Sequence, residues 1–306
     1  MRPPFFSVVI PVYNRAHLVL SSLQSVQQQS FTDWECIVVD DGSNDSNELK
    51  ALVDGLGDDR FRYLRRANGG GAAARNTGID AAFGQYIALL DSDDTFLPGK
   101  LDQDFIYLSG SDSGGHAAFC AVLLDRGVGA SWVKPRRGPH PNENISEYLA
   151  CRQGFIPTSS VVIARETAST IRYDESLLFG QDTDFALRLA AGGTRIVMLE
   201  KPLVQVRDDT RPDRISQQKK YLPILEWTDK IRAIMTPKAY LAYRGWHVAR
   251  LAAPFDIRMA YRLYFEALTA GALPPALAFK ALSQIAFPRK FYTQLVNSVV
   301  WLFGRR

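Results

Sequence analysis

The sequence has few cysteines and histidines, and neither residue is arranged as a disulfide framework or a zinc site would require. The 306 residues include three cysteines, Cys36, Cys120 and Cys151, which lie far apart and form no C-x-x-C pair. An odd number of isolated cysteines argues against disulfide bonds and favours a reducing compartment. The four histidines have no H-x-x-x-H spacing, so the pattern gives no indication of bound zinc.

Long apolar runs are also missing. No stretch approaches the roughly 18 to 20 apolar residues that a membrane-spanning helix needs. Residues 1–13 contain one arginine and a short apolar stretch, but no small-residue cleavage site follows them. Residues 5–12 are instead interpreted as a first buried strand. We therefore expect neither a signal peptide nor a membrane span, and a cytoplasmic protein.

The composition is that of a globular protein, with 46% hydrophobic and 22% charged residues. The net charge of +4 conceals an uneven distribution. The first 200 residues contain 18 Lys+Arg and 25 Asp+Glu, a net charge of −7, whereas the rest contain 18 and 7, a net charge of +11. A basic C-terminal third favours an anionic partner, namely a membrane surface, nucleic acid or another protein. A solvated helical surface would give the same pattern.

The first hundred residues alternate apolar segments with helical ones. The pattern predicts strands at 6–10, 34–39, 61–64 and 86–90, and helices at 17–28, 44–56 and 71–83. Strands that are apolar throughout and separated by helices are typical of a parallel sheet covered on both faces. In such sheets ligands bind beyond the carboxyl ends of the strands.

The rest of the chain is less regular at first and then becomes all helical. Further strands are predicted at 117–124 and 160–163, with a polar, proline-bearing loop at 134–144 between them. From about residue 217 the pattern is helical, with breaks at its prolines. We therefore expect two domains, residues 1–216 and a basic helical region at 217–306.

Polar clusters follow three of the predicted strands, where the sheet argument places a ligand. Tyr13-Asn14 follows the first strand, residues 40–43 (Asp-Asp-Gly-Ser) the second, and residues 91–94 (Asp-Ser-Asp-Asp) the fourth. A D-x-D pair suits a hard divalent cation that also binds phosphate. For residues 40–43 alone, a turn and a helix cap are favoured over a ligand site. For residues 91–94 function is favoured, because adjacent like charges are costly.

Residues 69–74 (Gly-Gly-Gly-Ala-Ala-Ala) also match the G-x-G-x-x-A fingerprint of dinucleotide-binding folds. That fingerprint belongs to the first strand–helix turn, whereas this one follows the third strand. An NAD-dependent oxidoreductase is therefore a weak alternative. The glycines can equally allow a close approach of the backbone to a phosphate or a neighbour.

Taken together, these motifs resemble the family 2 glycosyltransferases with a GT-A fold, a Rossmann-like, mostly parallel sheet flanked by helices. The resemblance covers roughly residues 5–216. The matching segments are Val9-Ile10-Pro11-Val12-Tyr13-Asn14, Asp40-Asp41-Gly42-Ser43, residues 68–78, Asp91-Ser92-Asp93-Asp94, Thr158-Ser159-Ser160, Tyr173-Asp174-Glu175 and residues 180–189. Each motif alone is modest evidence, but their shared order and spacing are specific.

The resemblance implies a role for each residue of the donor site. Pro11, Tyr13 and Asp41 look like the nucleobase pocket, with Asp41 matching the acid that typically reads uracil. Asp91 and Asp93 look like the D-x-D pair that binds the ribose and a Mg²⁺ or Mn²⁺ ion held by the diphosphate. The resemblance therefore implies a nucleotide-diphosphate sugar as the donor, with UDP as the expected nucleotide.

The resemblance also implies the residues around the reacting hydroxyl. Asp182 matches the aspartate of the family's Glu-Asp motif, the expected general base, and Arg75 looks like a residue behind Asp91. Gln181 departs from the pattern, because Glu is more usual there, which puts acceptor binding in doubt. Arg207 lies where relatives often place a basic residue near the donor phosphates, but the match is poor. Both are weak acceptor-side candidates.

The implied activity is an inverting transfer of a sugar to a glycan or a lipid-linked hydroxyl, with no nucleic-acid partner. Asp182 could instead cap the helix predicted at 185–191, but if it is catalytic, Asp184 becomes the expected cap. A non-catalytic nucleotide-sugar-binding protein on the same fold is the alternative, favoured only by Gln181. Polysaccharide or glycoconjugate synthesis is the expected setting.

The end of the chain carries one more hypothesis. Apolar residues recur at about helical spacing through 289–306, with basic residues at both ends of the segment. Such a helix is typical of an anionic membrane interface, although an apolar stripe packed into the core would look the same. We expect a peripheral position at the inner face of a membrane if the first interpretation holds.

Overall fold

The computed structural model describes residues 2–110, 116–125, 131–207 and 221–287, which divide into two compact units. The first unit contains residues 2–110, 116–125, 133–138 and 156–207 of the described chain, and the second contains 131–132, 139–155 and 221–287. The predicted boundary at 216/217 lies outside the described residues. Residues 139–155, predicted as part of the irregular middle stretch, group with the later helices.

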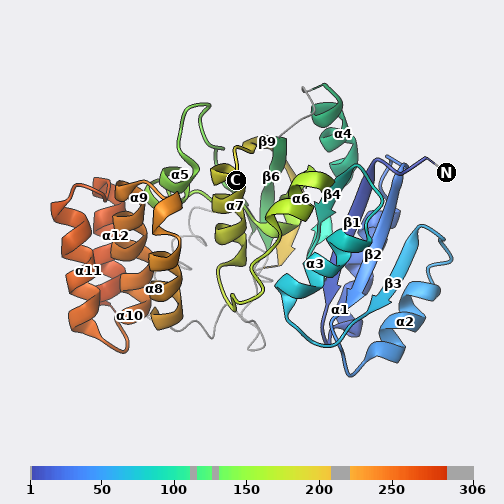
Figure 1. Ribbon diagram of the computed structural model, residues 1–306, viewed down its shortest axis with the longest axis horizontal. Helices are drawn as coiled ribbons and strands as arrows, with labels where there is room; N and C mark the ends of the chain where they lie inside the picture. Colours follow the sequence, from blue (N-terminus) through green and yellow to red (C-terminus); the bar gives the residue numbers. More distant parts are fainter. Residues whose placement is uncertain (1, 111–115, 126–130, 208–220, 288–306) are drawn as a thin grey trace. The chain divides into compact units, whose positions relative to one another are not determined.

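A sheet and its flanking helices form the first unit (Figure 1). Its strands are β1 (Phe6–Val12), β2 (Trp34–Asp40), β3 (Phe61–Arg65), β4 (Tyr86–Leu89), β5 (Thr95–Phe96), β6 (His116–Asp125), β8 (Val162–Ala164) and β9 (Arg195–Arg207). Its helices are α1 (Ala16–Gln27), α2 (Ser46–Asp54), α3 (Gly71–Ala81), α4 (Lys100–Gly110), α6 (Arg165–Ile171) and α7 (Gln181–Ala191), with a short 3-10 turn, η1 (Thr158–Ser160).

The strands follow the order β3-β2-β1-β4-β8-β6-β9-β5, and β7 (Ser131–Lys134) pairs with β6. Parallel pairs join β1 to β2 and β4, β2 to β3, and β6 to β9. β8 runs antiparallel to β4 and β6, and β5 antiparallel to β9, so the sheet is mixed. The predicted α/β fold is confirmed, and the carboxyl ends of β1, β2 and β4 share one edge.

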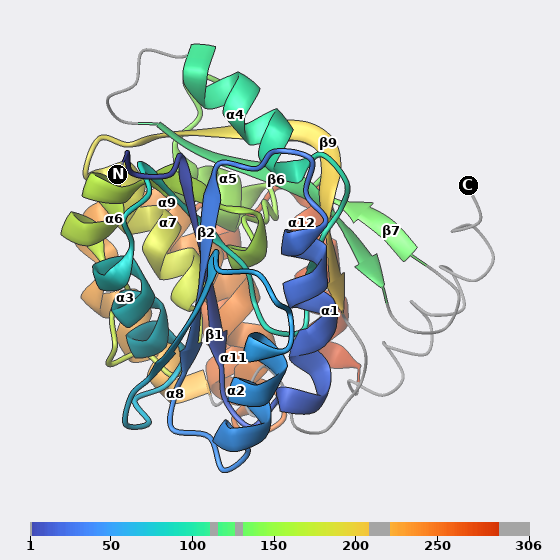
Figure 2. The same cartoon turned by 90° about the vertical axis from the view of Figure 1, so that its right-hand side faces the viewer.

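Helices cover both faces of the sheet, as continuous apolar strands require. Figure 2 shows α1 and α2 on one face of β1 and β2, and α3 with α6 on the other. Every residue of β2 is buried. Gly78 lets α3 approach β1, because a Cβ built at this position would lie 2.3 Å from Cγ1 of Val9.

The long strand β9 was not predicted. Its middle carries Glu200, Lys201 and Pro202, and strands are poor in all three residue types. The pairing with β6 shifts register on both sides of Ala121, which is opposite Pro202. A bulge therefore accommodates the polar, proline-containing middle of a strand that continues on both sides.

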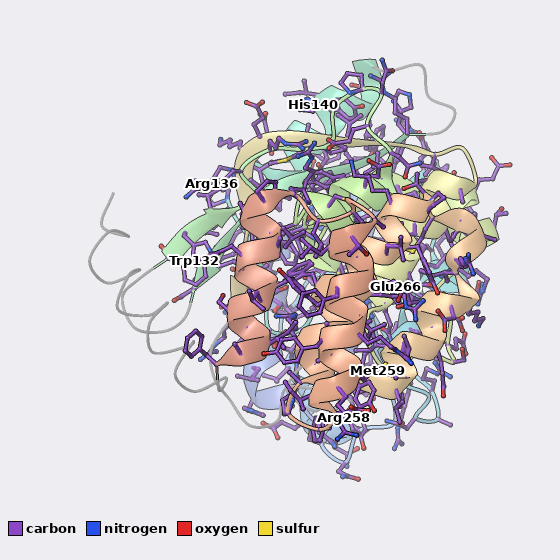
Figure 3. The ribbon with its side chains drawn as sticks, turned by 90° about the vertical axis from the view of Figure 1, so that its left-hand side faces the viewer. Trp132, Arg136, His140, Arg258, Met259 and Glu266 are labelled. Carbon is purple, nitrogen blue, oxygen red and sulfur yellow. The ribbon has the colours of Figure 1, made fainter. Side chains whose placement is uncertain are left out.

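Apart from its two residues of β7, the described part of the second unit has helices as its only regular elements, and over residues 221–287 this was predicted. Its elements are α5 (Ile145–Cys151), α8 (Tyr221–Lys230), η3 (Arg232–Ile234), α9 (Pro237–Tyr243), η4 (Arg244–Val248), α10 (Ala249–Ala252), α11 (Ile257–Thr269) and α12 (Pro275–Ala286). Arg258, Met259 and Glu266 mark the course of α11 in Figure 3. Pro237 and Pro275 begin helices α9 and α12, because proline suits the first turn.

Contacts between α5 and the start of α9 explain why residues 139–155 belong to this unit. The backbone N–H of Thr236 donates to Oγ of Ser146 at 3.1 Å, and its hydroxyl donates to Oε1 of Glu147 at 3.0 Å. Within the described ranges, no helix has the length and hydropathy of a membrane span. The segment 289–306, predicted as an interfacial helix, lies outside the described residues.

Candidate active site

The loops after β1 and β2 are joined by hydrogen bonds at the shared sheet edge. The backbone N–H of Asn14 donates to Oγ of Ser43 at 2.9 Å, and the N–H of Asn44 donates to Oδ1 of Asn14 at 2.8 Å. Asn14 has φ +52°, a left-handed conformation that asparagine tolerates better than most residues. The tight turn leaves Tyr13 48% exposed at this edge, where the sequence predicted a nucleobase to bind.

Asp40 is a structural residue of this edge. Its carboxylate accepts the N–H of Ser43 at 2.8 Å and the hydroxyl of Tyr63 at 2.5 Å. Burial alone would raise the pKa of Asp40, but hydrogen bonds from Ser46, Tyr63 and Ser43 lower it. Burial and the adjacent Asp40 raise the pKa of Tyr63 to about 12. The turn interpretation is therefore confirmed for this aspartate.

Asp41 fixes the glycine loop instead. Its two carboxylate oxygens accept the N–H groups of Gly69 at 3.0 Å and Gly70 at 2.7 Å, and Nε of Arg66 lies 3.5 Å away. These glycine N–H groups are the ones that a dinucleotide fold would offer to a pyrophosphate. The weak NAD alternative therefore loses its binding loop. The Asp41 side chain is only 3% exposed, so its predicted contact with a nucleobase stays a prediction.

Arg75 connects the D-x-D motif to the start of α7. From α3, its Nη2 lies 2.5 Å from Oδ1 of Asp91, and its Nη1 donates to Oε1 of Gln181 at 2.9 Å. Its guanidinium also lies 5.3 Å from the ring centroid of Tyr173. Burial would lower the pKa of Arg75, but the charges of Asp91 and Asp182 raise it overall. The guanidinium therefore stays charged between the D-x-D motif and the start of α7.

The acidic cluster contains an arginine side chain that the sequence did not predict there. Nη1 of Arg15, the residue before α1, lies 3.0 Å from Oδ2 of Asp93. Asp94 is buried and accepts the hydroxyl of Ser159 at 2.5 Å and the N–H of Arg207 at 3.1 Å. Burial raises the pKa of Asp94 well above its ordinary value, and the charges of Asp91 and Asp93 add to this. Arg207 thus reaches the cluster through its backbone, and its predicted phosphate role stays a prediction.

Asp182 lies in the first turn of α7, where its Oδ1 accepts the hydroxyl of Thr158 at 2.8 Å. The residue before α7 is Gly180, in the left-handed conformation, so the cap position itself carries no side chain. Capping by Asp182 was therefore the wrong alternative. Capping by Asp184 was also wrong, because Asp184 is the fourth residue of α7. Its carboxylate lies 2.6 Å from Nη2 of Arg188 one turn later.

Both the oxygen and the nitrogen of the Gln181 side-chain amide form hydrogen bonds. Oε1 accepts from Arg75, and Nε2 donates to the carbonyl oxygen of Leu177 at 2.7 Å. A glutamate would be an acceptor only and could not make the second bond. The departure from the family's usual residue therefore has a local reason, which is to hold the loop before α7.

A small cavity lies beneath α7 in the first unit. Apolar side chains form most of its wall, with Thr158, Tyr173 and Asp182 as the polar members. The full lining is Ala117, Ala118, Phe119, Ile156, Thr158, Val161, Tyr173, Asp182, Phe185, Ala186, Leu189 and Ile196. A sugar needs several polar partners, so this cavity is the packed underside of the helix that carries Asp182.

The residues present fit a divalent cation that takes most of its ligands from a substrate. Asp91, with a side chain 33% exposed, and Asp93 supply the hard carboxylate oxygens that Mg²⁺ and Mn²⁺ prefer. In the described part of the chain no group of three or more His, Cys, Asp or Glu side chains could hold a metal by itself. A cation here would therefore need diphosphate oxygens and water to complete its shell.

Two features of the site were not predicted from the sequence. Arg15 gave no signal, because it follows Tyr13-Asn14 as an ordinary residue before a helix. The segment 158–160 was recognised, but no role was given to its hydroxyls. The structure brings together Asp91, Asp93, Arg75, Gln181 and Asp182, and it places Pro11, Tyr13 and Asp41 on neighbouring strand ends.

Sequence comparisons identify a family and several relatives of this chain. A family model described as Glycosyl transferase family 2 matches residues 7–106. The amylovoran biosynthesis glycosyltransferase AmsB of Erwinia amylovora is 31% identical over 255 residues, which are 80% of this chain and 84% of AmsB. The UDP-Glc:alpha-D-GlcNAc-diphosphoundecaprenol beta-1,3-glucosyltransferase WfgD of Escherichia coli is 40% identical over 97 residues, 31% of this chain and 38% of WfgD.

Solved structures confirm the predicted GT-A fold. Staphylococcus aureus TarS, solved with UDP-GlcNAc, gives a TM-score of 0.63 at 16% identity, covering 92% of this chain and 88% of that chain. The mannosyltransferase PcManGT of Pyrobaculum calidifontis, solved with GDP-Man and Mn²⁺, gives 0.61 at 19% identity, covering 99% and 88%. The length and identity of the match to AmsB, with the family model, show that the chain belongs to glycosyltransferase family 2.

Proposed function

We propose that this protein is an inverting glycosyltransferase that moves a sugar from a UDP-sugar to a glycan or lipid-linked hydroxyl, in polysaccharide or glycoconjugate synthesis. The bridge made by Arg75 is the observation that carries this proposal. A single buried guanidinium contacts Asp91 of the D-x-D motif and Gln181 beside Asp182. The donor-binding acid and the base are thereby held on one framework.

The donor assignment rests on the residues at the ends of β1 and β2 and on relatives. Pro11 and Tyr13 would flank the base, and Asp41 would accept an N–H from uracil. TarS was solved with UDP-GlcNAc, and WfgD is named for UDP-Glc. PcManGT was solved with GDP-Man, so a guanine nucleotide is the outcome that would correct the choice of base.

Asp91 and Asp93 would hold a Mn²⁺ or Mg²⁺ ion together with the donor diphosphate. When bound, such an ion neutralises charge that builds up on the leaving phosphate. Arg15 and Arg75 supply fixed positive charge beside the same two carboxylates. Arg207 is a further candidate at this side, because its N–H is bonded to Asp94.

Asp182 would take the proton from the acceptor hydroxyl, which is a weak nucleophile at neutral pH. The acceptor oxygen then forms a bond to the anomeric carbon, and the bond from that carbon to the phosphate oxygen breaks. Its electron pair leaves with UDP, and the proton stays on Asp182. One displacement from the face opposite the leaving group inverts the anomeric centre.

We place the reaction at the cytoplasmic face of a membrane, where a lipid-linked acceptor would be presented. WfgD is named for an undecaprenol-linked acceptor. Exposed apolar side chains on α12 support this position, because Phe279 is 77% exposed and Leu282 is also exposed. Phe287, directly after α12, is exposed as well. Residues 1–216 would bind the donor, and residues 217–306, including the basic segment 289–306, would contact anionic lipid.

A panel of nucleotide sugars tests the proposal. The full chain is incubated with Mn²⁺ and one of UDP-glucose, UDP-galactose, UDP-GlcNAc or GDP-mannose, and release of the nucleoside diphosphate is measured. EDTA is the control for the metal, and NAD⁺ is the control ligand for binding. We expect slow release from one UDP-sugar, lost in EDTA. Binding of NAD⁺ but of no nucleotide sugar would overturn the proposal, and binding without turnover would favour a non-catalytic protein.

A further inference from the structure

The 3-10 turn η1 lies between the acidic cluster and α7. Both Thr158 and Ser159 are almost completely buried, with 3% and 1% of each residue exposed. Buried hydroxyls are nearly always hydrogen-bonded. Here two neighbouring hydroxyls bond to different acids of the active site, one on each side of the turn.

The hydroxyl of Thr158 reaches toward the base. It donates to Oδ1 of Asp182 at 2.8 Å, across 24 residues of sequence. A hydrogen bond to a charged carboxylate is stronger than one between neutral groups. The bond therefore fixes the orientation of the carboxylate in the first turn of α7, which has no side-chain cap of its own.

The hydroxyl of Ser159 reaches toward the D-x-D motif. It donates to Oδ2 of Asp94 at 2.5 Å and accepts the backbone N–H of Asp91 at 3.1 Å. The two bonds hold the chain on both sides of Asp93. A shift of this serine would therefore move both acids predicted to bind the cation.

Hydrogen bonds from α4 and β4 fix the position of the turn. Nζ of Lys100 donates to the carbonyl oxygen of Ser160 at 3.3 Å, and Lys100 is paired with Asp104 in a fully buried ion pair. The carbonyl oxygen of Val161 accepts the N–H of Leu89, at the end of β4, at 3.0 Å. These bonds connect η1 to α4 and to the strand that precedes the D-x-D motif.

We propose that η1 is the positioning element shared by the two halves of the active site, with Thr158 orienting the base Asp182 and Ser159 orienting the aspartates of the donor side. The proposal rests on the proposed function. It assigns neither hydroxyl to contact with substrate. It predicts that two adjacent residues of similar chemistry and burial affect different steps.

Two variants in the full chain, each lacking one hydroxyl, separate donor binding from turnover. Thr158→Val keeps the volume and removes the donor to Asp182, so turnover of the UDP-sugar selected by the panel falls about 10-fold or more, as expected for a lost charged hydrogen bond. The dissociation constant for UDP with Mn²⁺, measured by calorimetry, stays within about threefold. Ser159→Ala weakens UDP–Mn²⁺ binding about 10-fold and changes turnover at saturating donor less than about threefold.

Matched controls come from the same turn. Ser160→Ala removes an equally buried hydroxyl that donates only to the carbonyl oxygen of Pro157, so both readouts stay close to wild type. Thr158→Ser restores the donor, and turnover recovers. If Thr158→Val or Ser159→Ala does not fold, Thr158→Cys and Ser159→Cys provide the same comparison, because a thiol is only a weak hydrogen-bond donor. Turnover should then fall in the first variant, and UDP binding should weaken in the second.

The outcomes distinguish this inference from the proposed function. A Thr158→Val variant with wild-type turnover overturns the inference, and so do parallel losses of binding and turnover in all three turn variants. An Asp182→Asn variant assayed beside them reports on the proposed function. If it keeps full turnover, Asp182 is not the base. If it loses turnover while Thr158→Val does not, the inference fails alone.

Discussion

Asp93 is the residue at which the metal hypothesis can be tested. Replacing it by alanine removes a carboxylate that would bind the cation, which in turn would bind the diphosphate, so UDP should bind about 10-fold more weakly in Mn²⁺. In EDTA the variant and the wild type should bind UDP about equally. Calorimetry with and without Mn²⁺ measures both. Wild-type binding that is indifferent to EDTA would show that the D-x-D motif does not act through a metal.

Asp40 should contribute stability with a definite pH dependence. Its folded-state pKa is lowered from 3.8, so the contribution is present above the ordinary pKa and is lost as the pH falls through the lower folded-state value. Asp40→Asn should destabilise the protein at pH 7 by about 1.5–3 kcal/mol, the range for hydrogen bonds to a charged group. Urea unfolding at pH 7 and near pH 2.5 should show this difference shrinking. An equal difference at both pH values would contradict the assignment.

Individual residues also show what the sequence could and could not predict. Asp91, Asp93 and Asp182 were predicted as site residues because their motifs resemble those of a known family and follow a predicted strand or precede a predicted helix. The contacts of Arg15 with Asp93, and of Thr158 with Asp182, join residues 78 and 24 positions apart. Such pairings depend on the folded topology, and no local pattern carries them.

At the scale of elements, the fit of α3 on the sheet depends on Gly78. A methyl group at this position would lie 2.3 Å from Cγ1 of the buried Val9, so Gly78→Ala should overpack the interface. We expect a loss of roughly 1–3 kcal/mol in unfolding free energy. Thermal or urea unfolding measures it. The pair Gly78→Ala with Val9→Ala is the control, and failure of Val9→Ala to recover part of the loss would show that another contact limits the position.

Element prediction succeeded where the apolar pattern was uniform and failed where it was interrupted. β1, β2 and β4 are continuous apolar runs with polar ends, and the structure has them within two residues of the predicted bounds. β9 was not predicted, because Glu200, Lys201 and Pro202 interrupt its apolar pattern at a bulge. The helix α7 begins four residues earlier than predicted, because Gly180 rather than an acidic side chain precedes it.

At the scale of the whole molecule, the uneven charge leads to a membrane prediction. The last 106 residues carry 18 basic and 7 acidic side chains. If residues 289–306 contact anionic lipid, the full chain should sediment with phosphatidylglycerol vesicles at low salt and be released by about 0.5 M NaCl, since screening shortens the range of the attraction. Substituting Arg289, Lys290, Arg305 and Arg306 by Gln should weaken sedimentation.

A chain ending at Phe287 serves as the second arm of that experiment. It should stay folded, bind UDP and lose sedimentation with the same vesicles. If it aggregates, and the full chain does not sediment with vesicles at low salt, the segment is part of the core. The basic third would then be a solvated helical surface, as the sequence alone also allowed.

The central claim is that Asp182 is the general base of a sugar transfer. Asp182→Asn keeps the size of the side chain and an oxygen that can accept from Thr158, but it removes the proton acceptor. Turnover of the UDP-sugar selected by the panel should fall by at least about 10²-fold, the low end for a general base. UDP–Mn²⁺ binding should stay within about threefold of wild type. Wild-type turnover in this variant, with binding intact, would contradict the account.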